Sequence, residues 1–200
     1  MAKWWKSKTK GKEKVDVMDH PKYSLHLFAG AGGGLLADII DGIQPICAVE
    51  IEKHPQCVLA KRLPDLAIWD DVRTFRADNP ECADAFADLR AVADELVIAG
   101  GFPCQDISCA GRGAGLRGER SGLWREYARI IREIRPAYVF VENSPMLIQR
   151  GLGDVLGDLA ALRYDAAWGI LSAADMGAMH LRERFWLTAR RMADADDFRE

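Results

Sequence analysis

The chain has 200 residues, 49% of them hydrophobic, which is enough for one well-cored domain and too little for two. Its net charge of -3 excludes a general polycation, so a nucleic-acid partner has to be argued from local charge. The sequence contains no apolar run near the roughly 20 residues of a membrane span, and no apolar signal segment follows the basic N-terminus. We therefore expect a cytoplasmic protein that crosses no membrane.

Charge is concentrated at the N-terminus, where six lysines and two tryptophans fall within the first fourteen residues. We expect residues 1–21 to form a basic arm, residues 22–192 a single domain and residues 193–200 a polar tail. Two interpretations of the arm stay open. It is either a solvated tail or a segment that contacts phosphates, with Trp4 or Trp5 able to stack on a base.

From Tyr23 onward, short apolar runs alternate with helical stripes. In chain order, we predict a strand over 23–28, a helix over 35–40 stopped by Gly42, a strand over 46–49, a helix over 58–63 and a strand over 67–69. A helix over 82–93, a strand over 96–99, a helix over 123–134 and a strand over 138–141 follow. The last predicted elements are a helix over 155–162 and strands over 166–171 and 185–188. This alternation predicts an α/β fold with a doubly wound, mostly parallel sheet and helices on both faces. Ligands of such sheets bind beyond the carboxyl ends of the strands.

A glycine-rich turn, Phe28-Ala-Gly-Ala-Gly-Gly-Gly34, follows the first predicted strand. Glycines there allow a tight turn and the close approach of a ligand, and the next helix begins with free N–H groups. Leu35 holds the last glycine place of a Gly-x-Gly-x-x-Gly pattern, which disfavours a dinucleotide site. Taken alone, the run is nearly as compatible with a plain tight turn.

Two carboxylates end the next two predicted strands. Glu50 lies about twenty residues after the glycine turn, where an acidic residue can accept hydrogen bonds from ribose hydroxyls. Asp71 could accept a hydrogen bond from an adenine amino group. Each could instead be a solvated loop residue, but their order favours an adenosine-type cofactor. The absence of a phosphate-binding P-loop lysine favours a cofactor without phosphates.

The fourth predicted strand leads into Gly-Gly-Phe-Pro-Cys104-Gln. A cysteine in a loop after a strand is reachable, as a thiolate nucleophile must be, and Pro103 fixes the backbone beside it. The five cysteines are odd in number and none are spaced as Cys-x-x-Cys, so we expect neither a disulfide framework nor a bound metal. For Cys47, Cys57 and Cys82, an inert free cysteine is the better interpretation.

The Gly-Phe-Pro-Cys-Gln run, after the glycine turn and before Glu142-Asn143, resembles the carbon-5 DNA cytosine methyltransferases over Tyr23 to Arg191. The resemblance implies a Rossmann-like methyltransferase fold, S-adenosylmethionine as cofactor and DNA as partner. It implies cofactor contacts by Phe28, Gly30, Gly32, Gly33, Glu50, Ile51 and Asp71, and catalytic roles for Pro103, Cys104, Glu142, Arg182 and Arg184.

In the implied reaction, the Cys104 thiolate adds to carbon-6 of a cytosine that has been flipped out of the duplex. Glu142 engages the ring nitrogen and Arg184 the carbonyl, where negative charge develops. The chain departs from the family pattern at His26, Ser144 and His180, which stand where the family usually has an acidic residue, Val and Gln. We interpret His26 as a strand residue with a satisfied ring.

Family members continue with a target-recognition region and a final segment beyond the point where this chain ends. Three hypotheses follow: a minimal enzyme, one half of a split enzyme whose second chain supplies target recognition, or a truncated relic. An active DNA methyltransferase is the leading function. The alternatives are a non-catalytic DNA- or partner-binding module of the same fold and an RNA cytosine methyltransferase.

Overall fold

The structure is a computed structural model that describes residues 20–103 and 122–193. Almost all of the predicted basic arm, the predicted nucleophile Cys104 and most of the polar tail lie outside the described residues. No helix of the described ranges is long and apolar enough to cross a membrane.

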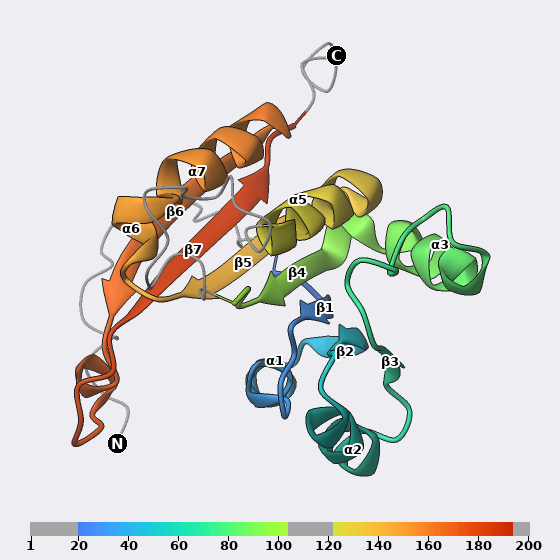
Figure 1. The fold of residues 1–200 in the computed structure, drawn as a ribbon, viewed down its shortest axis with the longest axis horizontal. Coiled ribbons are helices and arrows are strands. Elements are labelled where there is room, and N and C mark those ends of the chain that lie inside the picture. The colour runs from blue at the N-terminus through green and yellow to red at the C-terminus, as the bar shows by residue number, and fades with distance from the viewer. Residues whose placement is uncertain (1–19, 104–121, 194–200) are drawn as a thin grey trace, which may run out of the picture.

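The described residues form a seven-stranded sheet with the order β3-β2-β1-β4-β5-β7-β6 (Figure 1). The strands are β1 (Tyr23–Leu27), β2 (Gln44–Val49), β3 (Ala67–Trp69), β4 (Leu96–Gly100), β5 (Tyr138–Asn143), β6 (Tyr164–Leu171) and β7 (Arg184–Arg191). β1 to β5 pair in parallel, whereas β7 runs antiparallel to both of its neighbours. The predicted mostly parallel, doubly wound sheet is confirmed.

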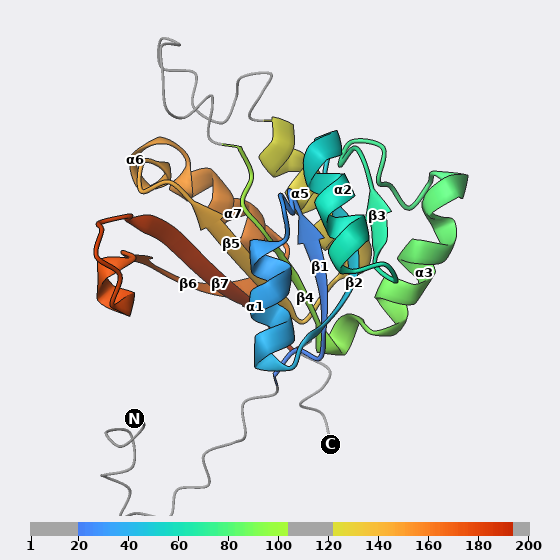
Figure 2. The same cartoon turned by 90° about the horizontal axis from the view of Figure 1, so that it is seen from below.

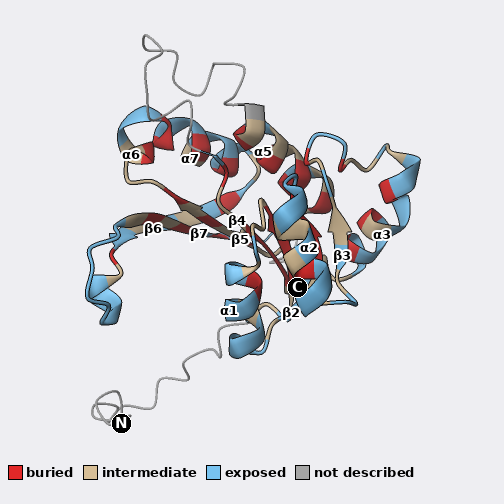
Figure 3. Ribbon diagram, turned by 60° about the horizontal axis from the view of Figure 1, so that its bottom comes forward, coloured by how far each residue is buried: buried red, intermediate tan, exposed pale blue. Residues whose placement is uncertain are grey.

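Helices cover the two faces of the sheet (Figures 2 and 3). They are α1 (Gly33–Asp41) and α2 (Lys53–Arg62), then α3 (Ala83–Ala91), α5 (Gly122–Ile134), α6 (Leu147–Arg150) and α7 (Leu152–Ala161), with 3-10 turns η1 (Pro80–Cys82), η2 (Ala93–Glu95) and η4 (Ala174–Met176). The larger core cluster packs α3, α5 and α7 against one face, and a smaller cluster of Leu35, Ala48 and Leu59 packs α1 and α2 against the other.

Local sequence explains why most elements lie where they do. Gly42 ends α1 in a left-handed conformation, with φ of 82°, and its N–H bonds to carbonyls of the last turn, as the pattern predicted. In α5, a stripe that includes Trp124, Tyr127 and Ile131 is buried, which confirms the predicted helix. β5 is longer than predicted and includes Glu142 and Asn143, because β7 pairs with both residues. The short helix α6 was not predicted.

Candidate active site

The neighbouring strands β1 and β4 mark the point where the strand order reverses, since the chain continues to β2 on one side and to β5 on the other. At such a point the loops after the two strands separate and leave a crevice at their carboxyl ends. Leu27 of β1 pairs with Gly100 of β4, so the glycine turn and the segment leading to Pro103 leave the sheet side by side. The sequence predicted that these two segments contribute to one site.

Glu50 holds the glycine turn in place. Its side chain is almost fully buried, and its carboxylate accepts the N–H groups of Gly30, at 2.7 Å, and Glu52, at 2.8 Å. Gly30 and Gly32 have φ values of 54° and 94°, and a Cβ at Gly32 would lie 2.8 Å from Leu59 Cδ2. A Cβ at Gly30 would meet nothing within 4 Å. The turn therefore needs glycine for its conformation and leaves open space beside it.

Phe28 and Ile51 flank the turn and the end of β2. Phe28 also has a positive φ, 56°, and its ring stacks on Tyr127 with centroids 6.4 Å apart. Tyr127 is fully buried, its hydroxyl lies within hydrogen-bond distance of the carbonyls of Ile98 and Phe140, and burial raises its pKa above the usual range. Ile51 is 55% exposed, so its apolar side chain is available for a ligand. Sequence reasoning missed Tyr127 as a support of the site, because it is one of several apolar residues in the α5 stripe.

Asp71 lies two residues after the end of β3, and its carboxylate is paired with Arg73. Arg73 donates from Nε to Oδ1 at 2.9 Å and from Nη2 to Oδ2 at 2.7 Å. These side-chain hydrogen bonds lower the pKa of Asp71 below its ordinary value. Glu50 N–H donates to the Trp69 carbonyl at 2.9 Å, which joins the ends of β2 and β3. The two predicted cofactor carboxylates therefore both lie at the carboxyl ends of the strands, and both are hydrogen-bonded to protein groups.

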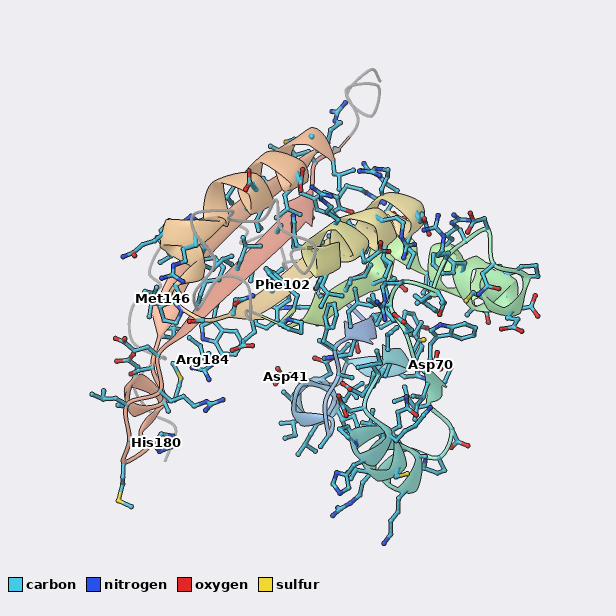
Figure 4. The ribbon with its side chains drawn as sticks, viewed as in Figure 1. Asp41, Asp70, Phe102, Met146, His180 and Arg184 are labelled. Atoms are coloured by element: carbon cyan, nitrogen blue, oxygen red, sulfur yellow. The ribbon has the colours of Figure 1, made fainter. Side chains whose placement is uncertain are left out.

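Glu142 and Arg184 are in direct contact, with 2.8 Å between Arg184 Nε and Glu142 Oε1. Both side chains remain about one-third exposed. The contact depends on the pairing of β5 with β7, which brings Glu142 opposite Trp186 and Arg184 to the start of β7. Figure 4 places Arg184 where the segment between β6 and β7 joins the sheet, and His180 farther out along that segment. Arg182 is exposed in the same segment.

The backbone before Pro103 packs against Glu142 and Asn143 at the end of β5. The buried side chain of Asn143 donates from Nδ2 to the Phe102 carbonyl at 3.1 Å, and its Oδ1 accepts the Ser144 N–H at 2.8 Å. A Cβ at Gly101 would lie 2.5 Å from Glu142 Oε2, so only glycine permits this close approach. Pro103 itself is exposed. Sequence reasoning missed Gly101, although the doubled glycine after β4 signals a close backbone approach.

Two cysteines and a histidine that the sequence marked as inert are buried in the fold. Burial raises the pKa of Cys47 to about 12, and it raises the pKa of Cys82, so both thiols are protonated near neutral pH. His26 lies in β1 with Nε2 2.6 Å from Asp38 Oδ2, which agrees with the interpretation of a satisfied strand histidine. Within residues 20–103 and 122–193, no group of three or more His, Cys, Asp or Glu side chains could hold a metal ion.

The strand order and the helices on both faces of the sheet define a Rossmann-like fold of the methyltransferase type. A family model described as C-5 cytosine-specific DNA methylase matches residues 23–196, and the chain belongs to this family. It is 33% identical to the type II methyltransferase M.CviJI of Paramecium bursaria Chlorella virus IL3A, over 84% of this chain and 43% of that protein. It is 28% identical to the type II methyltransferase M.AquIA of Picosynechococcus sp., over 90% of this chain and 76% of that protein.

Among solved structures, the chain resembles the Dnmt2 methyltransferase of S. pombe with a TM-score of 0.67 and 22% identity, over 88% of this chain and 54% of that one. A DNA modification methyltransferase encoded within an E. coli prophage matches with a TM-score of 0.66 and 23% identity, over 88% of this chain and 49% of that one. These likenesses agree with the fold. The chain spans less than half the length of M.CviJI.

Proposed function

We propose that this chain is the catalytic region of a DNA cytosine-5 methyltransferase that uses S-adenosylmethionine and acts on a flipped-out cytosine. The observation that carries the proposal is the contact between Glu142 and Arg184 beside the Phe102–Pro103 segment. A carboxyl group and a guanidinium side by side can hold the ring nitrogen and the adjacent carbonyl of one pyrimidine. Family membership supports this assignment.

The residues at the ends of β1, β2 and β3 fit S-adenosylmethionine. Gly30 and Gly33 face open space, where a ligand can approach the backbone. Glu50 would accept the ribose hydroxyls, Ile51 and Phe28 would contact the adenine ring, and Asp71 would accept its amino group. When bound, the cofactor supplies an electrophilic methyl group and no phosphate, which suits a turn without a phosphate-binding lysine.

In the proposed reaction, Cys104 attacks carbon-6 of the cytosine as a thiolate, and a carbon–sulfur bond forms. The displaced electron pair makes carbon-5 nucleophilic, while Glu142 at the ring nitrogen and Arg184 at the carbonyl stabilise the developing negative charge. Carbon-5 would then accept the methyl group, and the sulfonium–methyl bond would break to leave a neutral thioether. Loss of the carbon-5 proton to solvent restores the double bond between carbon-5 and carbon-6 and breaks the carbon–sulfur bond, which releases the Cys104 thiolate. Glu142 and Arg184 pair with each other before the base arrives, so each must redirect part of its hydrogen bonding to the cytosine.

A methyl-transfer assay tests this proposal. The chain is incubated with S-adenosylmethionine carrying a tritiated methyl group and cytosine-rich DNA, with and without a candidate partner chain. We expect Cys104→Ser to abolish transfer and leave cofactor binding intact, whereas Cys57→Ser, at an exposed position in α2, retains transfer. Absence of transfer by the wild-type chain under both conditions would contradict the proposal. Comparison with tRNA as acceptor separates a DNA enzyme from an RNA enzyme.

We also propose that a second polypeptide packs beside the site. In the described residues, no helix covers β5, β7 and β6 on the side of the sheet that carries α1 (Figures 2 and 3). Leu171 of β6 is exposed, and so are Leu36, Ile39 and Ile40 on α1. A second chain that supplies target recognition would cover these apolar side chains. DNA binding with steep salt dependence and no turnover would instead favour the non-catalytic module.

A further inference from the structure

We infer that Arg129 of α5 is a positioning residue for the adenine end of the cofactor site and acts through the turn that begins at Asp71. This inference rests on the proposed function, in which Asp71 accepts a hydrogen bond from the adenine amino group. Arg129 is 57 residues away from the turn in sequence and contacts its backbone directly.

The contact is specific in its geometry. Arg129 Nη2 donates to the carbonyls of Val72 and Phe75, both at 2.9 Å. The Arg129 side chain is only 13% exposed, so these bonds lie largely out of water. Two carbonyls pointing at one nitrogen fix the path of the backbone between them, which is the part of the turn that contains Arg73.

Two glutamates hold the guanidinium in place. Glu126 Oε2 lies 2.7 Å from Arg129 Nε, and Glu133 Oε2 lies 2.9 Å from Nη1, at the i-3 and i+4 positions of the same helix. Glu133 Oε2 also accepts the Ala77 N–H at 3.1 Å. The guanidinium therefore uses its planar, multi-donor geometry, which a lysine ammonium cannot reproduce.

The turn transmits this restraint to Asp71. The Asp71 carbonyl accepts the N–H groups of Thr74 and Phe75, both at 3.0 Å, so residues 71–75 form one closed turn. Arg73 within that turn donates to the Asp71 carboxylate. Fixing the carbonyls of Val72 and Phe75 therefore fixes the direction of the Asp71 side chain. The same helix carries Tyr127, which stacks on Phe28, so α5 supports the site at two places.

The test measures S-adenosylmethionine affinity of the full chain by calorimetry for wild type, Arg129→Lys, Asp71→Ala and the double variant. Lysine keeps the positive charge between Glu126 and Glu133, and circular dichroism and urea unfolding verify the fold. We expect Arg129→Lys to weaken binding about tenfold, equivalent to about 1.4 kcal/mol, and to add little once Asp71 is alanine. Arg132→Lys, at an exposed position of the same helix, should bind like wild type. Turnover at saturating cofactor should change less than KM.

The outcomes separate the inference from the proposed function. Wild-type protein that does not bind S-adenosylmethionine would overturn both. Binding by wild type that is unaffected by Asp71→Ala would overturn the adenine role of Asp71 and, with it, the positioning role of Arg129. If Asp71→Ala weakens binding but Arg129→Lys does not, or if the two effects simply add, the proposed function stands and the role of Arg129 is refuted.

Discussion

Replacing Glu50 with glutamine tests whether its buried carboxylate holds the glycine turn. The carboxylate accepts two backbone N–H groups at 2.7 and 2.8 Å, and its residue is 7% exposed. Glutamine keeps the shape, but its NH2 group must face one of these donors and its remaining oxygen is uncharged. The loss of one charge-assisted hydrogen bond and the weakening of the other lower the free energy of unfolding by about 2–3 kcal/mol.

Urea unfolding measures this loss directly, and a thermal scan should show a fall in Tm of about 2–4 °C for each kcal/mol in a chain of this size. Glu52→Gln is the matched control, because it makes the same chemical change two residues away at an exposed position whose side chain does not cap α2. We expect the control to stay within about 0.5 kcal/mol of wild type. If Glu50→Gln is as stable as the control, the carboxylate does not hold the turn.

Three further predictions concern the site and the core. Glu142→Gln and Arg184→Met should each lower methyl transfer by at least about 100-fold. A double-mutant cycle on the free energy of unfolding should give the partly exposed pair a coupling energy of about 0–1 kcal/mol. A coupling energy well above that range would mean that the pair is mainly structural. Gly101→Ala should reduce methyl transfer, because the added Cβ pushes the Glu142 side chain away. Gly153→Ala is the control and should retain transfer, since a Cβ there meets nothing within 4 Å. Equal activity of the two variants would contradict the close approach of Gly101 to Glu142. The raised pKa of Cys47 favours the neutral thiol in the folded state, so its contribution to stability is complete below pH 9 and is lost as the pH rises towards about 12. Urea unfolding across that range should show a shallower loss of stability for Cys47→Ala than for wild type, and parallel curves would show that folding does not raise the pKa of Cys47.

The strand-end positions of Gly30, Glu50 and Asp71 could be predicted because short apolar runs and the residues that end them are local in the sequence. The α5 helix was equally predictable, since its apolar stripe repeats at helical spacing. The hydrogen bonds from Arg129 to the turn that begins at Asp71 could not be predicted, because they join residues more than fifty positions apart. Their nearest signal was the pair of glutamates at i-3 and i+4, which also occurs on ordinary solvated helices.

The amino-acid sequence by itself determined the α/β class, the sheet-edge location of the candidate site and the order of its chemical groups, because each depends on local periodicity and on residue types at strand ends. Only the tertiary structure decided that β7 runs antiparallel beside β5 and brings Arg184 to Glu142. It also decided that Asn143 fixes the backbone before Pro103. Those contacts are formed by strand pairing and packing between distant segments, whose geometry no single stretch of sequence contains.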